Sequence, residues 1–286
     1  MSDAPWTIRL DGSGIASRDN GETALLDAET LAILRRLTRG LHTDLRQPTA
    51  TTHASIAEAR QATPQPGVGP PINETTVADV GAETIPLGPL TKPLDRSFGE
   101  VLAGRQSERT LQPLELGDLA TLLVHGARVR GWHQSDDGYQ MTSRPSPSAG
   151  ARHPYELMVV VQDVATVAPG LWLFDPARCC LVHRTIDHCT LQTTLAAVNA
   201  ATGLERSAPA TVFVVAHFER TLNRYPAGST LVWRDLGAVA STLHLVASAA
   251  GLASCIVGTA GVLESEESQL RTDGIALVVG KRRGLA

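Results

Sequence analysis

The stretch RPSPSAGARHPYE, residues 144–156, runs directly into the apolar segment LMVVV at 157–161. That segment has the length and the β-branched content of a buried strand. The stretch before it combines two closely spaced prolines with three consecutive small residues, Ser148, Ala149 and Gly150. Prolines stiffen a loop, and small residues let another group approach its backbone closely. The loop is therefore either an ordinary tight connection into the strand or a preformed surface for a flat ligand.

Composition narrows the class of protein. The chain has 286 residues, a net charge of −4 and four cysteines, two of them adjacent. A net charge of −4 gives no indication of a basic surface for nucleic acid. Four cysteines are too few for a disulfide scaffold in a chain of this length. The sequence contains neither a signal-peptide pattern nor a run of about 20 apolar residues. We therefore expect a cytoplasmic protein without a nucleic-acid or membrane partner.

Three regions differ in composition. Residues 1–42 contain short strand-like segments followed by a helical pattern at 28–39, which predicts a small N-terminal extension. Residues 43–93 are crowded with Pro, Thr, Gln and Gly, which predicts an extended linker. The prolines and leucines of 84–97 predict that the end of this linker lies along a folded surface. Residues 94–286 carry the periodic apolar segments of a main domain.

The main domain mixes helical patterns with short apolar strands. The segment 231–251 is apolar nearly all round, which predicts a buried helix. Strand patterns at 170–175 and 179–185 flank Pro176 and predict a hairpin. This interspersed order predicts an α+β or α/β layer fold. The other expected elements are helices at 97–110 and 114–129 and strands at 157–161, 211–218, 254–258 and 275–283.

The segment RQSERT, residues 105–110, carries two arginines four residues apart with a serine between them. At the end of a helix, this spacing brings two guanidinium groups and a hydroxyl within reach of one point. Such a donor set suits a phosphate, because arginine donates in a planar fork and the hydroxyl adds a further donor. The alternative is an exposed helix end with solvated charges. Two further segments, GLASCIVGTAG at 251–261 and VVGKRR at 278–283, place small or basic residues at strand ends.

Taken in chain order, these segments resemble the nitroreductase superfamily and, within it, the SagB-type azoline dehydrogenases. The resemblance rests on R-x-S-x-R, on PSAGARHPYE at 147–156 before a strand, and on FER…RY at 218–225. The resemblance rests also on three later segments in the same order: a buried helix ending in GL, a short strand ending in Gly, and a last strand ending in VG. The resemblance covers about residues 96–286, and PSAGARHPYE is its most specific part.

The resemblance implies a three-layer α+β fold with a central, mainly antiparallel sheet, and a homodimer with FMN at the subunit interface. It assigns the phosphate side of FMN to residues after the first helix and at the end of the last strand. It assigns the flavin ring to the small-residue loop and to the strand after the buried helix. The cofactor residues so implied are Arg105, Gln106, Ser107, Arg109, Pro147, Ser148, Ala149, Gly150, Val257, Gly258, Lys281 and Arg283.

A lysine–tyrosine pair is implicated in catalysis in these azoline dehydrogenases, and the matching positions here are Arg224 and Tyr225. An arginine stays protonated and cannot act as a general base. We therefore expect Tyr225 to be the base, with Arg224 as a neighbouring positive charge. The alternative is that Arg224 only binds peptide and that the enzyme runs a different redox reaction. A second departure lies in DLGAVAST at 235–242, where the family often reads E-x-G-H-x-x-Q-N.

The activity implied is the oxidation of azolines to thiazoles or oxazoles in a ribosomally made, thiopeptide-like peptide. The implied partners are an azoline-containing precursor peptide and a cyclodehydratase, which the N-terminal extension and linker are expected to help recruit. Two alternatives stay open. One is an FMN-dependent reductase that uses NAD(P)H on a dehydroamino acid, nitro or quinone substrate. The other is a flavin-free scaffold subunit of a peptide-modifying complex.

The segment CCLVHRTIDHC, residues 179–189, raises the question of a metal site because it offers five Cys and His side chains in a short span. Adjacent cysteines rarely serve one tetrahedral site, and the spacing fits no standard zinc finger. No metal is therefore expected. Two other histidines, His217 and His244, lie in apolar patterns and are interpreted as core or interface residues.

Overall fold

The computed structural model describes parts of the N-terminal region and most of the main domain. The described residues are 6–8, 15–18, 23–25, 82–225, 228–260 and 274–283. The chain divides into two units, residues 1–64 with 227–229 and residues 65–226 with 230–286. In the first unit, β1 (Trp6–Ile8), β2 (Ile15–Arg18) and β3 (Thr23–Leu25) form an antiparallel sheet where short strands were expected. The helix expected at 28–39 lies outside the described residues.

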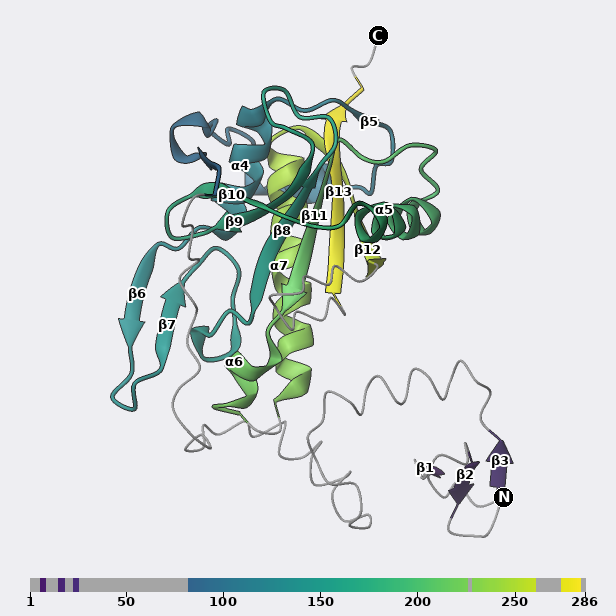
Figure 1. The fold of residues 1–286 in the computed structure, drawn as a ribbon. Coiled ribbons are helices and arrows are strands. Elements are labelled where there is room, and N and C mark those ends of the chain that lie inside the picture. The colour runs from purple at the N-terminus through teal and green to yellow at the C-terminus, as the bar shows by residue number, and fades with distance from the viewer. Residues whose placement is uncertain are drawn as a thin grey trace. The chain divides into compact units, whose positions relative to one another are not determined.

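The second unit is built on an eight-stranded antiparallel sheet of order β12-β13-β11-β8-β9-β10-β4, with β5 paired to β13 off this path (Figure 1). A separate hairpin consists of β6 (Gly131–Gln134) and β7 (Gln140–Ser143). The strands of the large sheet are β4 (Thr84–Pro86), β5 (Leu111–Gln112), β8 (Tyr155–Val161), β9 (Gly170–Asp175), β10 (Cys180–Arg184), β11 (Ala210–Ala216), β12 (Leu252–Ala260) and β13 (Gly274–Arg282).

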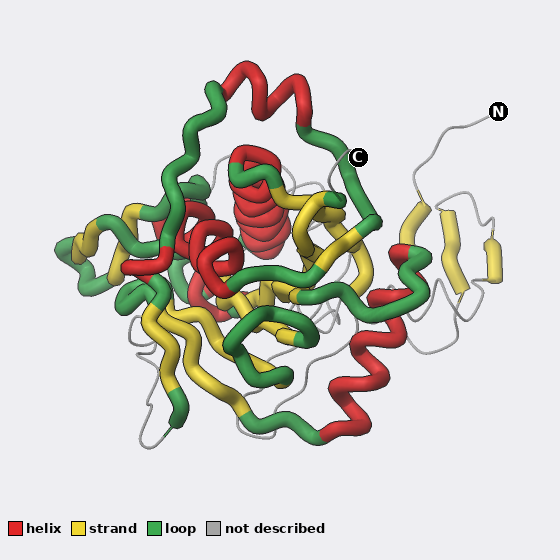
Figure 2. The backbone as a smooth tube through the Cα atoms, turned by 90° about the horizontal axis from the view of Figure 1, so that it is seen from above, coloured by secondary structure: helices red, strands yellow, loops and turns green. Residues whose placement is uncertain are grey.

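Helices cover both faces of this sheet (Figure 2). The helices are α3 (Phe98–Gly104), α4 (Leu116–Ala127), α5 (His188–Thr202), α6 (Phe218–Leu222) and α7 (Ser229–Ala249), with short 3₁₀ turns η1 (Gly88–Leu90) and η2 (Ala149–Ala151). Strand β8 shows how the layers form, because its side chains alternate between the two faces. Leu157 and Val159 pack in a core with α4 and α7, and Met158 and Val160 pack in a second core with α5. The expected three-layer α+β fold is confirmed.

Most sequence patterns of the main domain produced the expected element. The hairpin around Pro176 forms, and the Asp175 carboxylate accepts hydrogen bonds from the amides of Ala177 and Arg178 in its turn. Helix α7 forms where it was expected, but it is buried along one side only, and Trp233 on its other side is 40% exposed. The end of the predicted linker lies on the sheet, where β4 pairs with β10 and Leu87 is fully buried. Among the described residues, no helix is both long enough and apolar enough to cross a bilayer.

Two of the differences between expected and observed element boundaries bear on the predicted site. Helix α3 ends at Gly104 rather than at 110, because Arg105 is extended and the amide of Glu108 donates to the carbonyl of Ser254 in β12. The strand expected at 211–218 ends at Ala216, and FER is the first turn of α6. The segment after Gly104 is irregular chain, whereas the segment after Ala216 is helix α6 followed by Arg224 and Tyr225, and both segments carry predicted site residues.

Candidate functional site

Residues 105–109 form a loop that is fastened to the end of the sheet. The Glu108 amide donates to the Ser254 carbonyl at 2.8 Å, and the Glu108 carboxylate pairs with Arg282 of β13. Immediately after the loop, β5 pairs with β13, with Lys281 opposite Gln112. The contact is close, since a Cβ on Gly280 would lie 2.8 Å from the Gln112 carbonyl oxygen. The loop is therefore anchored beside the basic end of β13.

The side chains of this loop point outward and are available to a ligand. Gln106, Ser107 and Arg109 are exposed, and within the described part of the chain they make no hydrogen bond. Arg105 is exposed as well, and its guanidinium contacts His244 of α7 at 2.9 Å. A fixed backbone with free guanidinium and hydroxyl donors is the arrangement that a phosphate requires.

The basic end of β13 is partly neutralised. The Lys281 ammonium lies 3.2 Å from the Glu115 carboxylate and 3.7 Å from Asp118, both at the start of α4. The Lys281 side chain remains 41% exposed, and Arg283 is also exposed. The structure thus brings Lys281 and Arg283 to the same sheet end as residues 105–109, with Lys281 held by acidic partners.

The small-residue loop is tied to the first half of α7 by a buried carboxylate. Asp235, which is 5% exposed, accepts a hydrogen bond from the Ser148 hydroxyl at 2.6 Å and another from the Ala149 amide at 3.1 Å. Ser148 in turn accepts from the His153 amide at 2.8 Å. Burial raises the pKa of Asp235, although the hydrogen bonds from Ser148 and Ala149 oppose that rise. Sequence reasoning noted position 235 only as a departure from a motif, and it missed this anchoring role.

Tyr225 lies directly against this loop. Gly150 has a φ of +59°, and a Cβ placed on it would lie 2.5 Å from the Tyr225 hydroxyl oxygen. A left-handed φ is accessible to glycine without strain. Only glycine therefore allows both this backbone shape and this close approach of the phenol ring, so the structure brings together two parts of the predicted site that are 75 residues apart.

This contact predicts a specific cost for Gly150→Ala. We expect the free energy of unfolding to fall by about 2–3 kcal/mol, because the new methyl group adds a steric clash to the strain of a left-handed residue. Gly203→Ala is the matched control, since Gly203 has a φ of +70° and a Cβ added there would meet nothing within 4 Å. That control should cost only about 1 kcal/mol. If urea denaturation shows the same loss of unfolding free energy for Gly150→Ala and Gly203→Ala, the contact between Gly150 and Tyr225 is absent.

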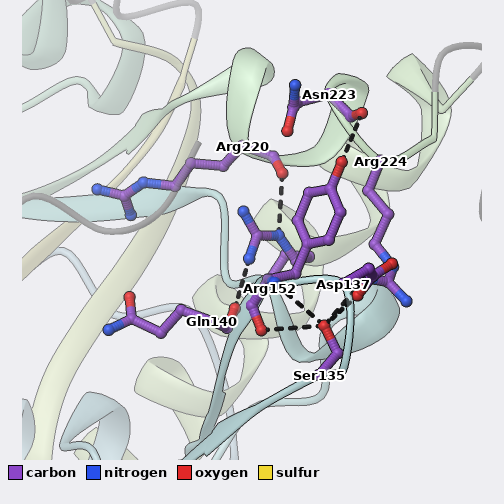
Figure 3. Close-up of polar contacts among 8 residues, drawn as sticks. Ser135, Asp137, Gln140, Arg152, Arg220, Asn223 and Arg224 are labelled. Atoms are coloured by element: carbon purple, nitrogen blue, oxygen red, sulfur yellow. Dashed lines mark hydrogen bonds and ion pairs between the residues drawn. The ribbon is translucent and has the colours of Figure 1, made fainter. Parts of the chain in front are cut away.

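Arg224 lies in a polar cluster with Ser135 and Asp137 from the turn of the β6–β7 hairpin (Figure 3). Its guanidinium pairs with Asp137 at 3.0 Å and lies 4.6 Å from the centre of the Tyr139 ring. The Tyr139 hydroxyl donates to the Asn223 carbonyl at 3.1 Å, and Arg152 donates to the Arg220 carbonyl at 3.0 Å. The hairpin thus holds the chain immediately before Tyr225.

The charge state of Arg224 is fixed by this cluster. Burial disfavours the charged guanidinium, but the hydrogen bond and the negative charge of Asp137 prevail and raise the pKa of Arg224. Arg224 is therefore a permanent cation beside Tyr225 and cannot accept a proton. The hairpin and Asp137 were not identified from the sequence.

A buried polar network underlies the loop. The Ser146 hydroxyl and the Tyr155 hydroxyl lie 2.7 Å apart, and His153 bonds to the Thr142 carbonyl at 2.9 Å through Nε2. Burial, together with the positive charge of Arg144, lowers the pKa of His153 to about 4, against the hydrogen bond to Thr142. His153 is therefore neutral in the folded protein near neutral pH.

This lowered pKa predicts a loss of stability in acid. Between pH 6.5 and about 4 the unfolded chain binds more protons at His153 than the folded chain does, so the free energy of unfolding falls as the pH falls. The expected contribution is about 3 kcal/mol by pH 4. Urea denaturation at several pH values should show a shallower pH dependence for His153→Asn than for the unchanged protein. Identical slopes would contradict the assignment.

The remaining predicted cofactor residues lie on β12. Val257 is 4% exposed and packs in the core beneath α5, whereas Gly258 is exposed beside an irregularity in the β12–β13 pairing. In the described residues no three His, Cys, Asp or Glu side chains gather as a metal site. Cys180 is buried in β10 and Cys189 is exposed at the start of α5, so these two cysteines lie in different elements.

Helix α7 connects the two halves of the site. Asp235 contacts the small-residue loop, and His244, nine residues later, contacts Arg105. At 1.5 Å per residue, these contacts are roughly 14 Å apart along the helix. In the comparison with known proteins, the model of the nitroreductase family matches residues 102–263, which is more than half of the chain. The chain belongs to the nitroreductase family.

Individual relatives agree with this assignment. The chain is 30% identical over 162 residues to protein MJ1384 of Methanocaldococcus jannaschii, a candidate nitroreductase, covering 56% of this chain and 77% of that protein. Among solved structures, a candidate nitroreductase from Ralstonia eutropha has a TM-score of 0.51 at 21% identity, covering 78% of this chain and all of that one. One from Anabaena variabilis has a TM-score of 0.54 at 15% identity. That alignment covers 71% of this chain but only 42% of the Anabaena chain. The two structures bear on the fold alone.

Nitroreductase-family proteins are typically flavin-dependent oxidoreductases, so the chain should offer a site for FMN. The donor set fits the phosphate, because Arg105, Ser107 and Arg109 are exposed on an anchored loop beside the end of β13. The loop at 147–150 fits a flat ring, because its side chains are small and its backbone is held from behind by Asp235. The residues present are therefore compatible with FMN.

Proposed function

We propose that this protein is an FMN-dependent dehydrogenase that oxidises azolines to azoles in a ribosomally made peptide. The observation that carries the proposal is the placement of the Tyr225 hydroxyl against Gly150 of the small-residue loop. That loop is the proposed seat of the flavin ring. A group that can accept a proton in its phenolate form therefore lies beside the proposed seat of a group that can accept a hydride.

The chain's residues have separate tasks in this proposal. Tyr225, as its phenolate, accepts the acidic Cα proton of the azoline ring and becomes a neutral phenol, and Arg224 supplies a fixed positive charge that stabilises the phenolate before the transfer. The hairpin cluster of Asp137 and Tyr139 holds this segment in place. When bound, FMN supplies the acceptor for the hydride that leaves Cβ. The ring loses two hydrogen atoms in total and becomes aromatic.

The cofactor contacts follow the two halves of the site. We assign the phosphate to Arg105, Gln106, Ser107 and Arg109, with Lys281 and Arg283 from the last strand. Binding by Lys281 requires its ammonium to leave Glu115 and Asp118 or to be shared with them, which its exposure permits. We assign the ring to the backbone of 147–150, with Val257 and Gly258 on another edge. FMN is an extended molecule, with its ring at one end and its phosphate at the other. It can therefore reach both parts of the site, which contact α7 at Asp235 and at His244.

The proposed partners are a second copy of the chain, an azoline-containing precursor peptide and a cyclodehydratase, all in the cytoplasm. Support for self-association comes from apolar side chains left open to solvent. Phe98 and Leu102 on α3 are 69% and 53% exposed, and Trp233 on α7 is 40% exposed. Buried against a second copy, such side chains contribute favourably to association.

The test is mass spectrometry of an azoline-bearing peptide incubated with FMN-loaded protein in air. The proposal predicts a product lighter by two hydrogen atoms for each ring oxidised. An unchanged peptide mass, with protein that holds FMN, would refute it.

One observation favours a second candidate, an FMN-dependent reductase that uses NAD(P)H. Arg224 replaces the lysine of the azoline dehydrogenases and is committed to Asp137 and Tyr139. If proton abstraction needs an amine base, this chain has none at that position. Oxidation of NAD(P)H in the presence of a nitro or quinone compound, without any change in an azoline peptide, would select this candidate.

A further inference from the structure

A histidine outside the predicted site contacts its phosphate-binding loop. His244 lies on α7 and is 4% exposed. Its Nε2 atom is 2.9 Å from a terminal nitrogen of Arg105, and its Nδ1 atom is 2.8 Å from the Ser254 hydroxyl. The imidazole therefore bridges the first residue after α3 and a residue of β12.

The chemistry of the partners fixes the proton on this ring. A guanidinium only donates hydrogen bonds, so Nε2 must be the acceptor. The single proton of the neutral ring is then on Nδ1 and is donated to the Ser254 oxygen. Ser254 is 2% exposed, and its carbonyl also accepts from the Glu108 amide. One β12 residue thus anchors both the loop backbone and the histidine that holds Arg105.

The electrostatic setting keeps the ring neutral. Burial and the positive charge of Arg105 both lower the pKa of His244, while the negative charge of Glu108 opposes them. A neutral ring is required, because a protonated Nε2 could not accept from Arg105.

We propose that His244 is a positioning residue for cofactor binding, which holds the Arg105 guanidinium in place for the phosphate of FMN. The inference rests on the proposed FMN site. An unrestrained arginine side chain loses about 1.5–2 kcal/mol of conformational freedom when it is ordered. Because His244 orders Arg105 before the anion arrives, part of that cost is removed from binding. His244 thus acts through Arg105 and not on the cofactor itself.

The test is a double-mutant cycle on FMN affinity, measured by quenching of flavin fluorescence in the full chain. Four proteins are compared: the unchanged chain, His244→Leu, Arg105→Ala and the double variant. We expect His244→Leu to weaken FMN binding about tenfold, since a charge-assisted contact is lost. In the Arg105→Ala background the same change should alter affinity by less than about twofold, because no guanidinium remains to be positioned.

A conservative variant separates positioning from packing. His244→Gln places an amide oxygen where it can accept from Arg105, so its FMN affinity should stay within about threefold of the unchanged chain. The inference is overturned if the His244→Gln variant binds FMN as weakly as the His244→Leu variant. It is also overturned if His244→Leu lowers FMN affinity by the same factor with and without Arg105. Additive costs alongside tight FMN binding by the unchanged chain would leave the proposed function intact. Failure of the unchanged chain to bind FMN would overturn both.

Discussion

Tyr225→Phe should lower turnover of an azoline peptide by about 100-fold or more, the usual range for loss of a general base. The aromatic ring, and with it the ring's packing against Gly150, is retained, and only the hydroxyl is lost. FMN affinity and the free energy of unfolding should therefore change little. The measurement is the rate of azole formation by mass spectrometry at saturating peptide, with flavin content determined for the same samples.

Tyr139→Phe provides the matched control, because it also removes one hydroxyl from this region. The Tyr139 hydroxyl donates to the Asn223 carbonyl and does not reach the loop at 147–150. Its loss should cost about 1 kcal/mol of stability and less than about tenfold in turnover. If Tyr225→Phe holds FMN and turns over as fast as the unchanged protein, Tyr225 is not the base.

Asp235→Ala should produce the largest loss of stability among the site variants, about 3 kcal/mol. The change leaves the Ser148 hydroxyl and the Ala149 amide without the buried acceptor that both now use. Hydrogen bonds to a charged group contribute about 1.5–3 kcal/mol each, and the two are not independent. Urea denaturation measures the loss, and FMN affinity should fall with it because the loop is no longer held.

Asp235→Asn tests whether the carboxylate itself matters. The amide keeps one oxygen acceptor but presents a donor where the second oxygen stood. We expect an intermediate loss of stability, with weakened rather than abolished FMN binding. A loss below about 1 kcal/mol for Asp235→Ala would contradict the role given to this residue in fixing the loop.

Sequence patterns predicted the main elements where apolar residues recur strongly. The buried helix α7, the hairpin around Pro176 and the strand after the quoted loop all formed as expected. Helix α5 was missed because its apolar face, Leu191, Leu195 and Val198, is sparse among threonines and alanines. Its Asp187 cap and the left-handed Gly203 that ends it were readable signals. The β6–β7 hairpin was missed because β6 is largely exposed and β7 has only one buried residue, so neither strand shows an apolar alternation.

The site was predictable only where a local motif carries it. RQSERT and the small-residue loop stand out in the sequence because their spacing or composition is unusual. The residues that hold them do not, because Asp235 lies 87 positions from Ser148 and His244 lies 139 positions from Arg105. Such pairs depend on how α7 packs on the sheet, and no local pattern encodes that packing.

The central claim is that the loop at 147–150 and Tyr225 together oxidise an azoline with FMN as the acceptor. The most direct measurement is the flavin absorbance spectrum of FMN-loaded protein mixed with an azoline peptide in the absence of oxygen. We expect bleaching of the oxidised flavin, with one flavin reduced for each azole formed. A spectrum that stays oxidised with the peptide, but bleaches on addition of NAD(P)H, would contradict it.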